Sequence, residues 1–117
     1  MSTAALLVPS PPLVVRPHGE QDRGRLARLL HSVSLDLSFE GGPQRLFVDV
    51  RRVSHLYDGA SVDLLQFLVV HRERLERVAV LTQHPGCLRR AARLALQSRM
   101  PLRVFEEGDE ALAWLGE

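Results

Sequence analysis

The apolar residues of this chain form short continuous runs that alternate with longer stretches in which they recur every three or four positions. Short runs bounded by turn residues are typical of strands, and we predict strands at 13–15, 46–50, 78–81 and 102–105. Recurrence at helical spacing predicts helices at 21–37, 61–76, 85–98 and 109–115, the last of them capped by Asp109.

This order of strand and helix, four times over, predicts a single α/β domain. Right-handed crossovers then give a mainly parallel sheet of four to five strands covered by about four helices. The strand runs are apolar throughout, as expected for strands buried on both faces, and we expect the first strand to pair antiparallel at one edge. We assign the domain to residues 11–117 and a flexible N-terminal arm to residues 1–10.

The segment Leu46–Leu68 is the most informative part of the pattern, because a strand leads through a turn into a long apolar helix. In α/β folds, ligands usually bind beyond the carboxyl ends of strands, near helix N-termini. Between Val62 and Val70 only Asp63 and Gln66 are polar, so the helix has more apolar surface than one sheet face can bury. We expect its outer apolar residues either to lie under a neighbouring helix or to form an exposed patch: Phe67, Val69 or Val70.

Composition and cysteine usage predict a cytoplasmic protein. The chain has 117 residues, 45% of them hydrophobic, which suffices for one core. The lone cysteine, Cys87, excludes an internal disulfide and a thiolate zinc site, and it fits a reducing compartment. The N-terminus lacks the basic region of a signal peptide, and no stretch is long and apolar enough to span a membrane.

All fifteen basic side chains are arginine, and the chain has no lysine, asparagine or isoleucine, a pattern typical of a GC-rich bacterial genome. A net charge of +1 and the lack of aromatic residues among the arginines argue against nucleic-acid binding. The absence of lysine excludes a phosphate-loop lysine and Schiff-base chemistry. We interpret the arginine-rich helix faces as solvated, with an acidic partner as the alternative.

The segment LFVDVRRVSHL, followed by a turn and SVDLLQFL, resembles the central element of STAS and SpoIIAA-like domains. The later segments VAVLTQHP, PLRVF and DEALAWL continue the resemblance, which covers Leu13 to Leu115. In these families a strand ending in aspartate leads to a loop of the form Asp-Ser-Ser-Gly or Asp-Ser-Thr-Gly, whose hydroxyl is phosphorylated. The resemblance implies a domain that regulates by binding another protein.

Carried over to this chain, the strand aspartate is Asp49, and the loop is Tyr57, Asp58, Gly59 and Ala60. The usual phosphorylatable hydroxyl is missing, whichever loop residue is aligned with the family's aspartate. Ser61 lies just beyond, where a hydroxyl more commonly serves the first turn of a helix.

For Asp58 we predict a helix N-cap, with a fixed anionic substitute for a phosphoserine as the alternative. For Asp49 we predict a carboxylate that orients the following loop, with a role in ligand binding as the alternative.

Two enzyme hypotheses fail on chemistry. Cys87 and Arg93 have the Cys-x5-Arg spacing of cysteine phosphatases, but the residues between them predict helix, not a phosphate-binding loop. A six-residue separation on a helix would also turn the two side chains onto different faces. A receiver domain needs an acidic pair after the first strand and a late lysine, and this chain has neither.

The five histidines show no pair at metal-ligand spacing, so we predict no metal and no cofactor. His55 and His84 are the two histidines expected near the carboxyl edge of the sheet, where they are candidates for ligand binding or for orienting a loop.

Together these observations predict a non-catalytic regulatory domain that binds protein through the 56–61 loop and the 61–76 helix. The candidate contact residues are Tyr57, Asp58, Gly59, Ser61 and Phe67. The resemblance implies a kinase, a sigma-factor regulator or another signalling protein as partner, and an exposed second helix is equally consistent with a homodimer. The alternatives are a small-molecule or lipid carrier, because SpoIIAA-like domains resemble the SEC14 type, and an orphan interaction module such as an immunity or scaffolding protein.

Overall fold

The structure is a computed structural model that describes residues 11–117, so the predicted arm over residues 1–10 lies outside the described residues. Its main sheet has four parallel strands in the order β1-β3-β5-β6. The strands are β1 (Leu13–Val15), β3 (Gln44–Asp49), β5 (Leu75–Leu81) and β6 (Leu102–Phe105). The predicted mainly parallel sheet is confirmed, with β1 at an edge.

The pairing of β1 differs from the prediction, since β1 runs parallel to β3. The chain returns through the long helix α2 (Arg23–Phe39), and such a crossover brings the next strand back in the same direction. The register aligns one valine from each strand in a row across the sheet: Val15, Val48, Val80 and Val104.

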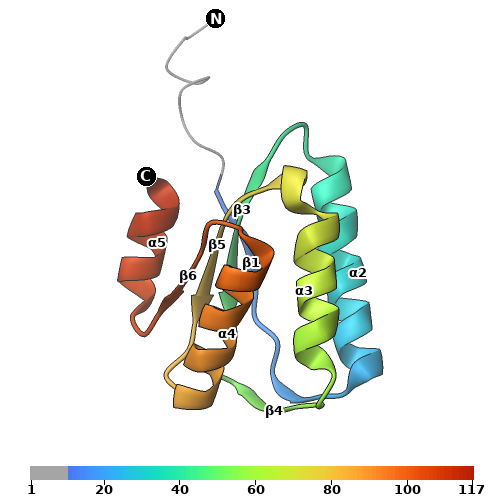
Figure 1. Cartoon of the computed structure of the whole chain (residues 1–117). Helices are drawn as coiled ribbons and strands as arrows, with labels where there is room; N and C mark the ends of the chain where they lie inside the picture. The colour runs from blue at the N-terminus through green and yellow to red at the C-terminus, as the bar shows by residue number, and fades with distance from the viewer. Residues whose placement is uncertain (1–10) are drawn as a thin grey trace, which may run out of the picture.

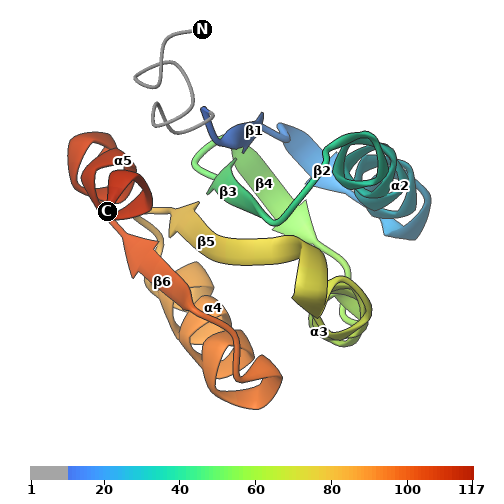
Figure 2. The ribbon, with the colours of Figure 1, turned by 90° about the horizontal axis from the view of Figure 1, so that it is seen from above.

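Three helices cover one face of this sheet and one covers the other (Figures 1 and 2). Helix α2, helix α3 (Ala60–Val70) and helix α4 (Pro85–Ser98) lie on the first face, and α5 (Gly108–Gly116) packs on the second against β3, β5 and β6. The strand order moves in one direction only, so right-handed crossovers bring successive helices to the same side.

Each face of the sheet has its own hydrophobic cluster. Under α2, α3 and α4 the buried residues include Val33, Leu37, Leu68, Val78 and Leu94. Under α5 the cluster comprises Phe47, Ala79, Leu81, Phe105, Ala111 and Leu115, with Trp114 against its edge. The ring of Trp114 lies 5.7 Å from that of Phe105, so the predicted packing of the last helix on the sheet is found.

A second sheet, absent from the prediction, pairs β2 (Gly19–Gln21) with β4 (Val53–Leu56) in parallel. We name this two-stranded sheet the β2–β4 ribbon. Its sequences, GEQ and VSHL, are too short and too polar to give a strand pattern. A tight turn after β3 leads into it, in which the Val53 N–H donates to the Val50 carbonyl at 3.1 Å.

Helix α3 is shorter than the predicted 61–76. It ends at Val70, a 3₁₀ turn covers Arg72–Arg74, and β5 begins at Leu75 instead of 78. The charged segment after Val70 has a helical composition, but the burial of Leu75 between the sheet and the helices draws the chain into the strand. Tertiary burial therefore overrides local helix propensity here.

Two predicted caps are wrong. The N-cap of α3 is Gly59 and not Asp58, because the chain turns there with the Ala60 N–H donating to the Tyr57 carbonyl at 3.0 Å. The N-cap of α5 is Glu107, which leaves Asp109 inside the first turn. Within the described part of the chain, no helix is long and apolar enough to cross a membrane.

Candidate functional site

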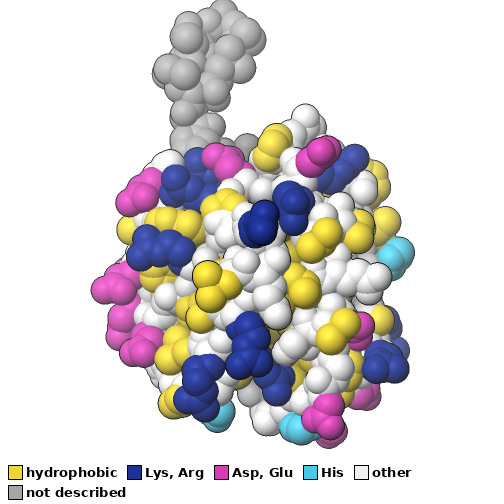
Figure 3. All heavy atoms as spheres, in the orientation of Figure 1, with side chains coloured by type: hydrophobic (Ala, Val, Ile, Leu, Met, Phe, Trp, Pro, Cys, Tyr) yellow, Lys and Arg dark blue, Asp and Glu magenta, His cyan; other side chains and the backbone are white. Residues whose placement is uncertain are grey.

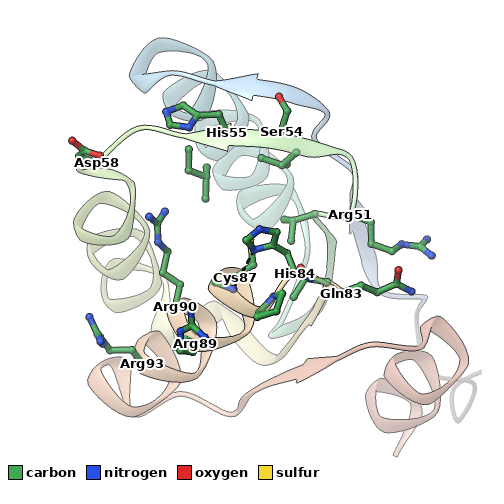
Figure 4. Close-up of a pocket in the computed structure, with 16 residues that line it drawn as sticks. Arg51, Ser54, His55, Asp58, Gln83, His84, Cys87, Arg89, Arg90 and Arg93 are labelled. Atoms are coloured by element: carbon green, nitrogen blue, oxygen red, sulfur yellow. Dashed lines mark hydrogen bonds between the residues drawn. The ribbon is translucent and has the colours of Figure 1, made fainter.

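A cleft of about 810 Å³ lies between β4 and the N-terminal half of α4, at the carboxyl ends of β3 and β5. Sixteen residues line it, and Figure 4 shows them coming from opposite walls. Ser54, His55 and Asp58 belong to the wall formed by β4 and the loop after it. The other wall begins at the end of β5 and continues along the first two turns of α4.

The cleft is strongly basic. Its lining contains four arginines, Arg51, Arg89, Arg90 and Arg93, and a single carboxylate, that of Asp58. Figure 3 shows basic side chains gathered over the lower, N-terminal part of α4. Arg51 is paired with Asp49, and the Asp58 carboxylate cannot balance the three remaining guanidinium groups, so the local potential favours anions.

Three of these arginines are free of protein partners. Within the described residues the side chains of Arg89, Arg90 and Arg93 have no hydrogen bond, ion pair or aromatic ring beneath them. Several other arginines are used structurally: Arg77, for example, donates to the Trp114 carbonyl at 2.6 Å. The α4 arginines are therefore available for a ligand.

His84 closes the N-terminus of α4 beside the cleft. The His84 Nδ1 accepts a hydrogen bond from the Gly86 backbone N–H at 3.1 Å, and the backbone N–H of His84 donates to Thr82 Oγ1 at 3.2 Å. Because Nδ1 accepts, the neutral ring carries its hydrogen on Nε2 and presents a donor. The cap thereby fixes the orientation of the imidazole.

Asp49 and Arg51 hold the turn that leads into the cleft. The Asp49 carboxylate accepts from the Arg51 backbone N–H at 3.1 Å and from the guanidinium at 3.0 and 2.8 Å, while Arg16 lies 3.8 Å away. The hydrogen bonds from Arg51 hold the pKa of Asp49 below its usual value, against the opposing effect of burial. Asp49 itself does not line the cleft, but it fixes Arg51, which does.

The loop before α3 is fixed on its other side by Tyr57. The Tyr57 hydroxyl donates to the Asp63 carboxylate, and the guanidinium of Arg23 lies 5.4 Å from the centre of the tyrosine ring. Burial, and then the hydrogen bond to Asp63, raise the pKa of Tyr57. The loop backbone is also tied to the β2–β4 ribbon, since the Tyr57 N–H donates to the Gln21 carbonyl at 3.3 Å.

The outer face of α3 carries a row of exposed residues that we name the α3 ridge: Val62, Gln66, Val69 and Val70. The exposed fractions of the three valines are 68%, 46% and 70%. Phe67 instead packs against the core, with its ring 4.5 Å from that of His71. The predicted exposed patch exists, but Phe67 faces inward and Val62 takes its place.

The structure divides the predicted site residues into two groups. His55, Asp58 and His84 line the cleft, His55 and Asp58 on the β4 side and His84 on the α4 side. Tyr57, Gly59 and Ser61 lie outside the cleft lining, at the turn into α3.

The α4 arginines were interpreted as a solvated face, because their helical spacing is the same as that of the other arginine-rich helices. Cys87 and Arg93 both line the cleft, from positions six residues apart on α4, a separation that turns their side chains onto different faces of the helix. The segment between them is continuous helix, as predicted, and forms no phosphate-binding loop. Among the described residues no group of three or more histidine, cysteine, aspartate or glutamate side chains is placed to hold a metal ion.

Comparison with known proteins places this geometry in a family. A family model described as SpoIIAA-like matches residues 13–116. A crystal structure of an uncharacterized protein from Shewanella loihica PV-4, of the DUF3478 family and with a SpoIIAA-like fold, superimposes with a TM-score of 0.70. That chain is 18% identical, and the match covers 87% of the present chain and 82% of the other. No curated protein sequence matches.

Proposed function

Because the chain belongs to the SpoIIAA-like family, we propose that it is a non-catalytic regulatory domain that binds another protein through the loop Leu56–Ser61 and helix α3. The family fold supports a STAS-type regulatory role in general, and domains of this kind typically bind proteins and are generally not enzymes. A kinase, a sigma-factor regulator or another signalling protein is the class of partner we expect.

The α3 ridge is the observation that carries the proposal. Three valines of one helix face are exposed to water, which costs free energy that a partner surface would recover. The loop beside it is held rigid by Tyr57 and Asp63, so a partner would meet a preformed surface. The loop and the α3 ridge are consecutive in the chain and offer a partner one continuous surface.

We propose that this surface works without a phosphorylation cycle. The loop residues Gly59 and Ala60 carry no hydroxyl, and Ser61 lies half-buried in the first turn of α3. Asp58, which is exposed and caps no helix, supplies a constant negative charge in this loop.

The cleft gives no support to the alternative of an apolar carrier. An apolar ligand would bring the three arginines of α4, unpaired within the described residues, out of water without pairing them, which is costly. An immunity or scaffolding module remains within the proposal, since it too would act by binding a protein.

The test is affinity capture from the native host with the full chain as bait. We expect one protein to be captured by the wild type and lost with Val62→Arg/Val70→Arg. The matched control is Leu112→Arg on α5, a half-exposed leucine on the opposite face of the sheet. Retention of that protein by the ridge variant, or its loss with the control, would contradict the assignment of α3. Native mass spectra that show only bound lipid would overturn the proposal in favour of the carrier.

A further inference from the structure

We propose that the cleft between β4 and α4 binds an extended acidic segment of the partner protein, with acidic side chains at alternate positions. The inference rests on the proposed function and names the chemistry of its partner. It is carried by the unpaired arginines of α4, by their spacing and by the open edge of β4.

The charge of the cleft demands an anionic occupant. Arg89, Arg90 and Arg93 are unpaired within the described residues, and the fourth arginine of the lining, Arg51, already serves Asp49. A carboxylate accepts two parallel hydrogen bonds from a guanidinium, and arginine gives up its water more readily than lysine. The site is thus suited to several carboxylates.

The spacing of the arginines favours an extended chain over a compact anion. Arg89 and Arg93 are four residues apart on α4, which places them on the same side with an axial separation of about 6 Å. Alternate side chains of an extended peptide repeat every ~6.6 Å on one face. Two acidic residues separated by one residue would therefore reach both arginines at once.

The backbone of β4 offers the second half of the site. Within the described chain β4 pairs only with β2, and Figure 4 shows β2 on the side of β4 away from α4. All four residues of β4 line the cleft. An unpaired strand edge binds extended peptides through main-chain hydrogen bonds, which fixes the alternating exposure of their side chains.

The cleft is continuous with the surface assigned to the partner. Leu56 and Asp58 belong both to the cleft lining and to the loop before α3. The Asp58 carboxylate repels acidic groups at this end of the cleft, so the acidic residues are directed to the α4 wall. One partner can then cover the α3 ridge and extend a strand into the cleft.

The experiment measures binding of the full chain to a fluorescein-labelled heptapeptide in which glutamate alternates with valine. Fluorescence anisotropy at low salt should show saturable binding that weakens as salt is added. We expect Arg89→Gln/Arg93→Gln to weaken binding at least about tenfold. The matched control, Arg28→Gln/Arg99→Gln, removes two other arginines whose side chains are unpaired within the described residues, and it should bind within about twofold of the wild type.

Three results would overturn the inference. The first is equal weakening by both double variants, which indicates unspecific attraction to net charge. The second is equal or tighter binding of a peptide of the same composition with its glutamates contiguous, which contradicts the extended register. The third is tight binding of inorganic pyrophosphate that depends on Arg89 and Arg93, without binding of the peptide, which assigns the cleft to a small phosphorylated ligand.

The same variants separate this inference from the proposed function. The ridge variant Val62→Arg/Val70→Arg should leave peptide binding unchanged, because the ridge lies outside the cleft lining. Failure of the peptide with partner capture still dependent on the ridge refutes the cleft proposal alone. Peptide binding without any ridge-dependent partner refutes the proposed function alone.

Discussion

The Asp49 carboxylate accepts three hydrogen bonds from a single residue, Arg51: one from its backbone N–H and two from its guanidinium. The pair closes the turn between β3 and the β2–β4 ribbon and orients the arginine that lines the near end of the cleft. Since Asp49 is the last residue of β3, a strand end and the wall of the site are coupled directly.

The stability contributed by the contact between Asp49 and Arg51 should depend on pH. The folded-state pKa of Asp49 is lowered, so its contribution to stability is fully present above the ordinary value of 3.8 and is lost as the pH falls through the folded pKa. We expect Asp49→Asn to lower the urea midpoint at pH 6, and the difference from wild type to vanish at the acid end. Asp36→Asn, at an exposed position of α2, is the control. A difference that persists unchanged into acid would contradict the ionic origin.

The phenol of Tyr57 offers a clean spectroscopic reading of the loop. Tyr57 is the single tyrosine of the chain, and burial together with Asp63 raises its pKa above 10. Absorbance at alkaline pH should therefore show a late transition, and Asp63→Asn should bring it earlier because one negative charge is removed. Asp36→Asn should leave the curve in place. An unshifted transition in Asp63→Asn would mean that the loop is not held by this contact.

His71 should make stability fall on mild acidification. Burial, with a smaller effect of Arg74, lowers the pKa of this histidine below 6.5, so the unfolded chain binds the proton first. The contribution is present above pH 6.5 and is lost as the pH falls toward the folded pKa. Chemical denaturation between pH 7.5 and 5 should show this loss in the wild type and in His31→Gln, and less of it in His71→Phe. Identical slopes in all three proteins would count against it.

The layer beneath α5 is small, so each of its residues should matter. Leu115 is 2% exposed and belongs to the second hydrophobic cluster, and Leu115→Ala should cost about 2–5 kcal/mol in the free energy of unfolding. Leu112→Ala, on the same helix but 49% exposed, should cost less than about 0.5 kcal/mol. Urea titrations monitored by circular dichroism distinguish the two. Equal losses would mean that α5 is not docked by its inner face.

The elements that local pattern determines were predictable from the sequence. Helix 85–98 and strand 102–105 have the predicted bounds, because a proline at the helix start and a short apolar run are unambiguous signals. The segment 71–76 was not predictable, since its charged residues have helical propensity and the burial of Leu75 is a tertiary effect. The β2–β4 ribbon was not predicted for the same reason, since its strands are held by pairing between distant segments and contain no apolar run.

The candidate site was only partly predictable. His55 and His84 were expected near the carboxyl edge of the sheet, and both line the cleft, as does Asp58, which was predicted as a helix N-cap. The α4 arginines were not assigned to it, because an arginine on a solvated face and one on a cleft wall have the same sequence pattern. What distinguishes them is the ribbon opposite.

The strand order β1-β3-β5-β6 runs in one direction, so this sheet has no point at which the winding reverses. Doubly wound folds obtain their crevice at such a point, from the sheet itself. Here the crevice is instead formed between the β2–β4 ribbon and α4, and its lining residues belong to neither hydrophobic cluster. The residues that line the cleft are thus different from those that form the core. The ribbon and the arginines can therefore change from one member of the family to another without disturbing the fold.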